Sequence, residues 1–583
     1  ATLYALETRD GRVHFVEFTF PVSFASGERR RLIRIEAPFD DSVLDLGRWV
    51  ALPVADLAVH LEGSTLTLAV LDAQRRLRLL RQGEADRGLP LLPPTITAPR
   101  TVPADAADEP AAAVRVLLAS RQWLFLVRED GRVDAFDVRF ADAPRHLASA
   151  DTNAADPARI TLLLGGGSLL VPRSEDPATD RIEQWFPVRR EEEAGFELRR
   201  VRSFRAAAGG RIVTEARRRG FLVLGTDGRL SIHHTTAERT LLRRDLETGE
   251  PRARALSARG DLLLIEDVEG RLVRWRIDNE HPEASLSALF TPTWYEGYAE
   301  PTLAWQSSSA STDAEPKFSL VPLAAGTLKA ALYSILLAIP VALFGAVYTA
   351  YFMAPALRAW IKPSIELMAA LPTVILGFLA GLWLAPIVER ELASVLAFLF
   401  LVPLLCIATG PAVRRLPPAV RAAVPDGWQA LLMVPVLLLG LWLASLAGPL
   451  LDQLTGGDLR VWLRTEQGIA YDQRNAIVVG IAMGVAVIPV IFAIAEDAIH
   501  SVPTRLSHGA LALGASRWMA LLRVVLPTAS PGIFSAIMIG FGRAVGETMI
   551  VLMASGNTPI LAMDPFSGMR TFAANLAVEL PES

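Results

Sequence analysis

The sequence predicts a two-part chain, with an all-β N-terminal domain followed by a polytopic α-helical membrane domain. Charged residues are concentrated before residue 320, whereas the rest consists of long apolar runs joined by short charged loops. The N-terminal part alternates apolar and polar residues over short runs that end in turn residues, as half-buried β-strands do. At 583 residues the chain is also too long for a single hydrophobic core. We therefore expect a β-rich domain at 1–305, a linker at 306–319 and a membrane domain at 320–583.

A turn motif recurs along the β-rich part. Asp-Gly or Glu-Gly followed by Arg and an aliphatic residue occurs at 9–13, 129–133, 226–230 and 269–273, with weaker copies near Asp72 and Asp180. Such a Gly provides the positive φ of a tight hairpin, and the residues after it start the return strand. Spacings of roughly 40 to 65 residues fit four-stranded blades. We therefore favour a β-propeller over a β-sandwich for this domain.

Six runs without Asp, Glu, Lys or Arg are long enough to cross a membrane, which takes about 20 apolar residues in a helix. They lie at 330–357, 367–388, 392–413, 427–451, 475–495 and 524–542. Buried helices of a large soluble enzyme are the alternative, but so many chargeless runs in succession are not typical of a soluble core. We expect six membrane-spanning helices.

The short loops between these runs differ in positive charge, and Lys and Arg near span ends are retained on the cytoplasmic side of a membrane. One alternating set of loops contains Arg358, Lys362, Arg414, Arg415, Arg421, Arg505, Arg517 and Arg523. The other set contains only Arg390, Arg460, Arg464 and Arg474. We therefore expect the 496–527 loop in the cytoplasm, and the β-rich domain and the C-terminal end outside it.

The predicted cytoplasmic loop contains a motif of small residues. It reads Ser-His-Gly-Ala-Leu-Ala-Leu-Gly-Ala-Ser-Arg-Trp at 507–518 and Arg-Val-Val-Leu-Pro at 523–527. A short helix of small residues can approach a partner closely, Gly514 allows a turn, and Pro527 can begin the next span. At this spacing the loop resembles the EAA loop of ABC-importer permeases, with His508 and Gly509 in place of that motif's Glu and Ala. The resemblance implies docking onto a separate ABC ATPase subunit through Ala510, Gly514, Ala515, Ser516, Leu526 and Pro527.

Further motifs surround this loop, upstream at 320–323, 362–367 and 369–372 and downstream at 530–533, 540–549 and 556–559. Together they resemble phosphate-specific permeases of the PstC type. The resemblance implies a path for inorganic phosphate across the bacterial inner membrane, with the β-rich domain in the periplasm. It also implies three protein partners, namely the ATPase subunit, a second permease subunit and a periplasmic phosphate-binding protein.

Part of the chain departs from this resemblance. The runs at 392–413 and 427–451 look like a hairpin added to the shorter members of the family, and its role is open. Permeases of this type have one more span before a periplasmic domain and one more after the last span here. We therefore expect the sequence to be a fragment of a longer chain.

Arg543 and Glu547 are the candidate substrate residues, with Thr548 beside them. A charge inside a span costs several kcal/mol unless it is paired or faces water, so such residues mark functional sites. Their spacing lets the two side chains meet, but Arg before Glu is the less favourable order for stabilising a helix. A guanidinium offers an oxyanion a planar fork of donors. We expect Arg543 to contact the transported anion and Glu547 to hold Arg543 when no anion is present, with a purely structural pair as the alternative.

Several classes of function are not indicated. None of the three lysines follows a Gly-rich turn, so the chain has no phosphate loop for ATP. We expect a transport subunit without ATPase activity, catalytic residues, metal or other cofactor. The adjacent His233 and His234 would point to opposite faces of a strand, which argues against a shared metal. The net charge of −4 and pI near 6.2 do not favour a nucleic-acid partner.

Two other interpretations stay open. One is a permease for sulfate or molybdate, because a single arginine does not discriminate among oxyanions. The other is an extracytoplasmic propeller that acts as a sensor or an enzyme, with the spans as its anchor. A single helix would be enough for that anchor.

Overall fold

The computed structural model describes most of the chain after residue 112 and shorter stretches before it. The described residues are 113–414 and 433–580 apart from 120–121, 141–143, 165–166, 177–178, 191–194, 247–250, 258, 268, 280 and 307–314, together with 2–8, 12–19, 22–23, 30–31, 34–36, 43–46, 52–62, 65–74, 76–81 and 100–101. Contacts divide the chain into a β-rich unit, 1–302 with 307–318, and a helical unit, 303–306 with 319–583. Most of the predicted linker, at 307–314, lies outside the described residues.

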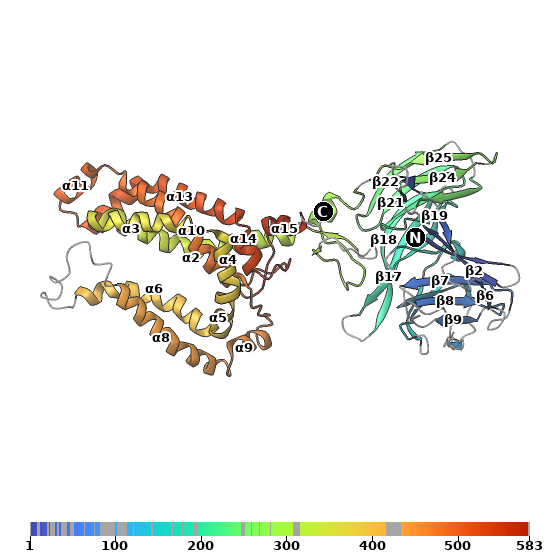
Figure 1. The fold of residues 1–583 in the computed structure, drawn as a ribbon, viewed down its shortest axis with the longest axis horizontal. Coiled ribbons are helices and arrows are strands. Elements are labelled where there is room, and N and C mark those ends of the chain that lie inside the picture. Colours follow the sequence, from blue (N-terminus) through green and yellow to red (C-terminus); the bar gives the residue numbers. More distant parts are fainter. Residues whose placement is uncertain are drawn as a thin grey trace. The chain divides into compact units, whose positions relative to one another are not determined.

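The β-rich unit is a series of small antiparallel sheets (Figure 1). In order, the main sheets contain β1 (Thr2–Glu7), β2 (Arg12–Thr19), β5 (Arg34–Glu36) and β6 (Val43–Asp45); β7 (Asp56–Glu62), β8 (Thr65–Leu71), β9 (Leu77–Arg81) and β10 (Arg100–Thr101); β11 (Ala113–Leu118), β12 (Trp123–Arg128), β13 (Arg132–Asp137) and β14 (Arg145–Asp151); β15 (Thr161–Leu162), β16 (Leu169–Asp176), β17 (Thr179–Arg189) and β18 (Phe196–Ala207); β19 (Arg211–Thr214), β20 (Gly220–Leu224), β21 (Arg229–His234) and β22 (Arg239–Asp245); and β23 (Ala253–Leu256), β24 (Leu262–Glu266) and β25 (Leu272–Arg276). From β7 onward, each strand pairs with the next one along the chain within its own sheet.

From the sheet of β7–β10 onward, hydrophobic clusters join each sheet to the next one. One cluster contains Leu71 of β8 and Leu124 of β12, and the next contains Phe125 of β12 and Leu169 of β16. Neighbouring residues of β12 thus face different partner sheets, as the period of two in a strand requires. Two further clusters continue the series through β20 to β24. Successive four-stranded sheets packed face to face are blades of a β-propeller, and they exclude the two-sheet sandwich.

The recurrent Gly residues lie in the predicted hairpins. Gly131, Gly228 and Gly270 have φ of 81°, 79° and 79° in the turns that follow β12, β20 and β24. A side chain with a Cβ is strained at such φ values. At the weaker copy, the Asp72 carboxylate accepts hydrogen bonds from the backbone N–H groups of Gln74 and Arg76, both at 2.9 Å. The copy at 9–13 lies partly outside the described residues.

The helical unit contains six helical stretches of membrane-spanning length and apolarity within its described residues, which confirms the predicted number. Its elements are α2 (Val321–Val347), η3 (Tyr348–Phe352), α3 (Pro355–Met368), α4 (Thr373–Leu379), η4 (Ala380–Leu384), α5 (Ala385–Arg390), α6 (Leu392–Arg414), α8 (Met433–Leu454), α9 (Leu459–Thr465), α10 (Ala476–His500), α11 (Thr504–Ala512), α12 (Arg517–Ala520), η6 (Leu521–Val525), α13 (Leu526–Gly546), α14 (Met549–Ala554) and α15 (Phe572–Glu579). These six spans are those of a multi-pass membrane protein.

The α10 helix is the centre of this unit and packs against α2 and α13 (Figure 1). Of the apolar window of α10, 61% is buried, the largest share among the six spans. Gly540 of α13 lies so close to α10 that an added Cβ would come within 2.4 Å of Ile491. The α6–α8 pair, which corresponds to the predicted added hairpin, packs mainly against itself (Figure 1).

Candidate functional site

The 507–527 loop forms an exposed helix, a turn and the start of a second helix. The α11 helix contains no buried residue, and Gly514 follows it with φ of 87°. Ser516 then caps α12, because its hydroxyl accepts a hydrogen bond from the backbone N–H of Met519 at 3.2 Å. Leu513 is 92% exposed and Trp518 is 58% exposed. The loop therefore presents large apolar side chains on its surface.

The start of the sixth span agrees with the prediction in part. The α13 helix begins at Leu526 with Pro527 in its first turn, but the continuous helical stretch already begins at Arg517. The five residues before α13 form η6, a π-helical segment. The wider π-helical turn accommodates a residue that has no backbone N–H and whose ring would clash in a regular α-helix.

A charge cluster joins α3 to the end of α10, next to this loop. Glu496 is fully buried, and its carboxylate lies 2.5 Å from Arg358 Nη2 and 2.9 Å from Lys362 Nζ. Lys362 also contacts Asp497 at 2.5 Å. Burial lowers the pKa of Lys362, but hydrogen bonds to Asp497 and Glu496 outweigh this effect and raise the pKa. Only residues 501–503 separate α10 from α11, so the cluster fixes the point from which the exposed helix leaves the bundle.

The predicted pair of Arg543 and Glu547 is not formed. The α13 helix ends at Gly546, and Glu547 has an extended backbone with ψ of 123°. Its carboxylate instead lies 3.4 Å from the backbone N–H of Ile550, at the start of α14. The helical geometry that would place residues four apart together is therefore interrupted between them.

Arg543 is half-buried, and within the described part of the chain its guanidinium has no ion-pair partner. The neighbouring Gly542 and Gly546 lie in open space, since a Cβ added to either would meet no atom within 4 Å. Thr548 is bonded to the Gly546 carbonyl at 3.3 Å. At 1.5 Å per residue, Arg543 lies about 39 Å along the helix from Arg517, so the candidate substrate residues are far from α11.

The opposite end of α10 has a polar cluster that the sequence did not single out. Lys329 of α2 is buried, and its ammonium donates to the Ser567 hydroxyl at 2.7 Å and the Ser567 carbonyl at 3.1 Å. Asp564 accepts from the same hydroxyl at 2.8 Å. Burial raises the pKa of Asp564, but hydrogen bonds from Ser567 and Phe566 outweigh this effect and lower it. A lone lysine in an apolar run was the available signal, but its partners are more than 230 residues away.

The β-rich unit shows no grouping of His, Cys, Asp or Glu that could hold a metal within its described residues. His233 and His234 are both buried on β21. His233 lies 2.9 Å from the Ser231 hydroxyl, whereas His234 accepts from the backbone N–H of Ala237 at 3.3 Å. The two rings therefore have separate structural partners.

The helical unit matches a known family of membrane proteins. Residues 338–578 match the model described as "Binding-protein-dependent transport system inner membrane component". Residues 338–578, most of the helical unit, therefore have the permease fold that this model describes. The permease domain includes the exposed loop, the charge cluster at Glu496 and the break after α13.

Curated proteins with similar sequences are transport permeases. The phosphate transport system permease protein PstC 1 of Mycobacterium tuberculosis is 34% identical over 208 residues, which are 33% of this chain and 60% of that protein. The PstC of Pasteurella multocida is 30% identical over 34% of this chain and 64% of its own length. The probable ABC transporter permease protein YqgH of Bacillus subtilis is 24% identical over 46% of this chain and 62% of its own length. The chain thus covers less than two thirds of each of these relatives.

Among solved structures, the β-propeller domain of Cps50 (Swd1) from Myceliophteria thermophila is similar over 47% of this chain and 80% of that chain. The TM-score is 0.31 and the sequence identity is 15%.

Proposed function

We propose that this chain is the permease subunit of an ATP-driven importer of inorganic phosphate. The family match to residues 338–578 is the observation that supports this function most strongly. The curated relatives named as phosphate transport permeases favour phosphate over sulfate or molybdate as the transported anion. The chain itself has no ATPase activity in this proposal, and a separate subunit hydrolyses ATP.

The exposed loop at 507–527 docks onto that ATPase subunit. Its surface combines exposed Leu513 and Trp518 with the positive charges of Arg505 and Arg517, and the sequence has no Asp or Glu between Asp497 and Glu547. An apolar groove with an acidic rim would complement this surface. The buried Glu496 cluster keeps the loop in a fixed relation to α10, so that motion of the ATPase is transmitted to the bundle.

Arg543 contacts phosphate on its way through the membrane. Its guanidinium has unused donors within the described part of the chain, and the neighbouring Gly542 and Gly546 leave space for an anion. Thr548 offers a hydroxyl at the break between α13 and α14. A second permease subunit completes the pathway, and a periplasmic phosphate-binding protein delivers the anion.

The chain lies in the bacterial inner membrane with the loop in the cytoplasm and the β-rich unit in the periplasm. The charge bias of the short loops supports this orientation. Arg358 and Lys362 meet the α10 end that leads into α11, so the structure groups these basic residues with the loop at one end of the bundle.

Site-directed cross-linking tests the docking. Cys406 is the single cysteine, so Cys406→Ser gives a background into which one cysteine is placed at a time. Ala510→Cys should cross-link to a co-expressed ATPase subunit through a short bifunctional reagent. Gln467→Cys, an exposed position near the other end of α10, is the matched control and should not. Cross-linking at Gln467 and not at Ala510 would place the ATPase at the end of the bundle opposite to the 507–527 loop and refute the proposal.

A further inference from the structure

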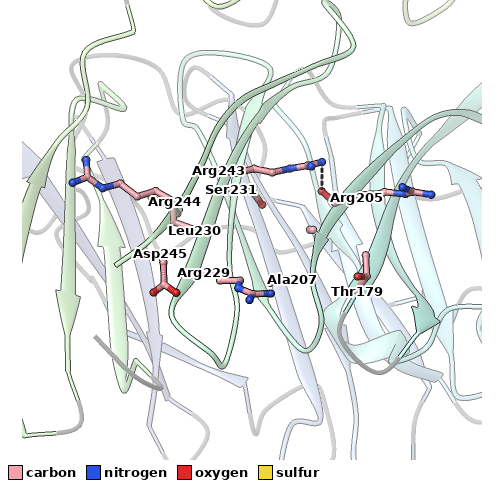
Figure 2. A pocket seen from close by; sticks show the side chains of 10 residues that line it. Thr179, Arg205, Ala207, Arg229, Leu230, Ser231, Arg243, Arg244 and Asp245 are labelled. Carbon is pink, nitrogen blue, oxygen red and sulfur yellow. Dashed lines mark hydrogen bonds between the residues drawn. The ribbon is translucent and has the colours of Figure 1, made fainter. Parts of the chain in front are cut away.

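A pocket lined by arginines lies between two sheets of the β-rich unit (Figure 2). Its volume is about 470 Å³. One wall comes from β17 and β18, with Thr179 and Arg205, and the other comes from β21 and β22, with Arg229, Ser231 and Arg243. The pocket belongs entirely to the β-rich unit, so it is separate from the permease domain.

The register of β21 and β22 explains why these side chains share a face. Ser231 lies opposite Arg243, and Arg229 lies opposite Asp245 in the antiparallel pair. Residues two apart in a strand point to the same side, so all four face the pocket. Arg244 also lines the pocket, but its guanidinium lies over the ring of Trp275 at 5.0 Å.

The pocket has more positive charge than its own carboxylate neutralises. Arg243 donates one long hydrogen bond, 3.5 Å, to the Arg205 carbonyl, and it forms no ion pair within the described residues (Figure 2). Arg229 lies 3.4 Å from Asp227 at the exposed hairpin turn. A guanidinium has five N–H donors, so most donors of Arg243 remain available. Four arginines, at 205, 229, 243 and 244, line the pocket together with a single carboxylate, Asp245.

Two hydroxyl groups supplement these arginines. Ser231 is buried in the pocket wall, and its hydroxyl lies 2.9 Å from His233 Nε2, which fixes the position of the oxygen. The hydroxyl of Thr179 lines the opposite wall. No aromatic side chain lines the pocket among its described residues, so the pocket lacks a stacking surface for a base.

We propose that this pocket binds a compact oxyanion of the phosphate type, either the free ion or the phosphate group of a small ester. Guanidinium groups and hydroxyls on two walls are the donors that recognise such oxygens. The volume lies within the range of small-molecule sites and leaves room for bridging waters or for the organic part of an ester. In this proposal the β-rich unit contains an anion-binding site of its own.

Hydrogen exchange of the full chain in lipid nanodiscs, measured by mass spectrometry, tests this proposal peptide by peptide. Inorganic phosphate should protect peptides that contain β18 and β21–β22, whereas sodium chloride at the same ionic strength should not. Glycerol phosphate is compared with inorganic phosphate. Stronger protection by glycerol phosphate identifies the ester as the ligand, and stronger protection by inorganic phosphate identifies the free ion. The local measurement separates this pocket from any phosphate that the permease domain binds.

Variants make the test specific. Arg229→Gln together with Arg243→Gln should raise the half-saturating phosphate concentration at least about tenfold, because two charge-assisted contacts are lost. Arg274→Gln together with Arg276→Gln removes equal charge from exposed positions of β25 and should leave protection unchanged. The proposal is overturned if phosphate protects these strands no more than chloride does, or if both double variants behave alike.

Discussion

Arg543 lies beside Gly542 and Gly546, which are in open space, and it lacks an ion-pair partner within the described residues. If it contacts phosphate, the bidentate fork matters as well as the charge. We expect Arg543→Ala to lower phosphate uptake by at least about tenfold, the loss of one charge-assisted contact, and Arg543→Lys to lower it substantially. Arg464→Lys in α9 is the matched control. Uptake by cells that contain the complete importer measures both, with membrane insertion checked by immunoblotting.

Glu547 supplies a second comparison at the same site. The Glu547 carboxylate lies at the start of α14, so Glu547→Ala should lower the stability of that helix by about 1 kcal/mol. The change should neither restore nor replace the proposed contact between Arg543 and phosphate. The variant lacking both side chains should insert normally and remain inactive. Substantial uptake by that double variant would show that Arg543 serves the architecture only.

We expect His233 and His234 to make the stability of the β-rich unit depend on pH. Desolvation by burial is the main cause that lowers the pKa of each from 6.5 to about 4, and nearby arginines add to it. The unfolded chain takes up protons near pH 6.5 that the folded unit accepts only near pH 4, so stability falls as the pH drops through this window. Between pH 7 and pH 5, each histidine should lower the free energy of unfolding by about 2 kcal/mol.

Hydrogen exchange of the β21 amides at these two pH values measures this loss, after correction for intrinsic exchange. His233→Gln should remove about half of the pH dependence, whereas His281→Gln at an exposed position should not change it. A pH dependence that survives replacement of both buried histidines would contradict the assignment.

In our proposal the docking geometry depends on the turn between α11 and α12. Gly514 has φ of 87°, and a Cβ added there would meet no atom within 4 Å, so the backbone conformation is the only obstacle to alanine. Gly509 in α11 also has open space but a helical conformation. Gly514→Ala should therefore cost about 1 kcal/mol locally and reduce transport-coupled ATP hydrolysis, and Gly509→Ala should not. Equal coupling in the two variants would mean that this turn does not set the docking geometry.

Elements with a local cause were predictable from the sequence. The hairpin glycines, the number of spans and the short helix before Gly514 all follow from residue patterns within about 20 positions. The break at Glu547 was missed because the apolar run continues on both sides of it, although a glycine such as Gly546 is common at a helix end. The Lys329 and Glu496 clusters were missed because their partners come from distant elements, and sequence spacing contains no information about such contacts.

In our proposal the loop charges determine the orientation of the whole molecule, and this orientation decides on which side of the membrane each part lies. Protease added to spheroplasts should cut within 1–319, because the β-rich unit lies outside the cytoplasmic membrane in our proposal. The 507–527 loop should be protected until the membrane is opened. Cleavage of the β-rich unit only after the membrane is opened would invert the orientation, and the docking proposal would fail with it.

Transport by the complete assembly is the most direct test of the central claim. The complete protein is reconstituted into proteoliposomes with its ATPase subunit, its second permease subunit and the binding protein, and the uptake of radiolabelled phosphate and sulfate is compared. We predict ATP-dependent uptake of phosphate that exceeds uptake of sulfate and is lost when this chain is omitted. Uptake that favours sulfate, or that proceeds without this chain, would contradict the account.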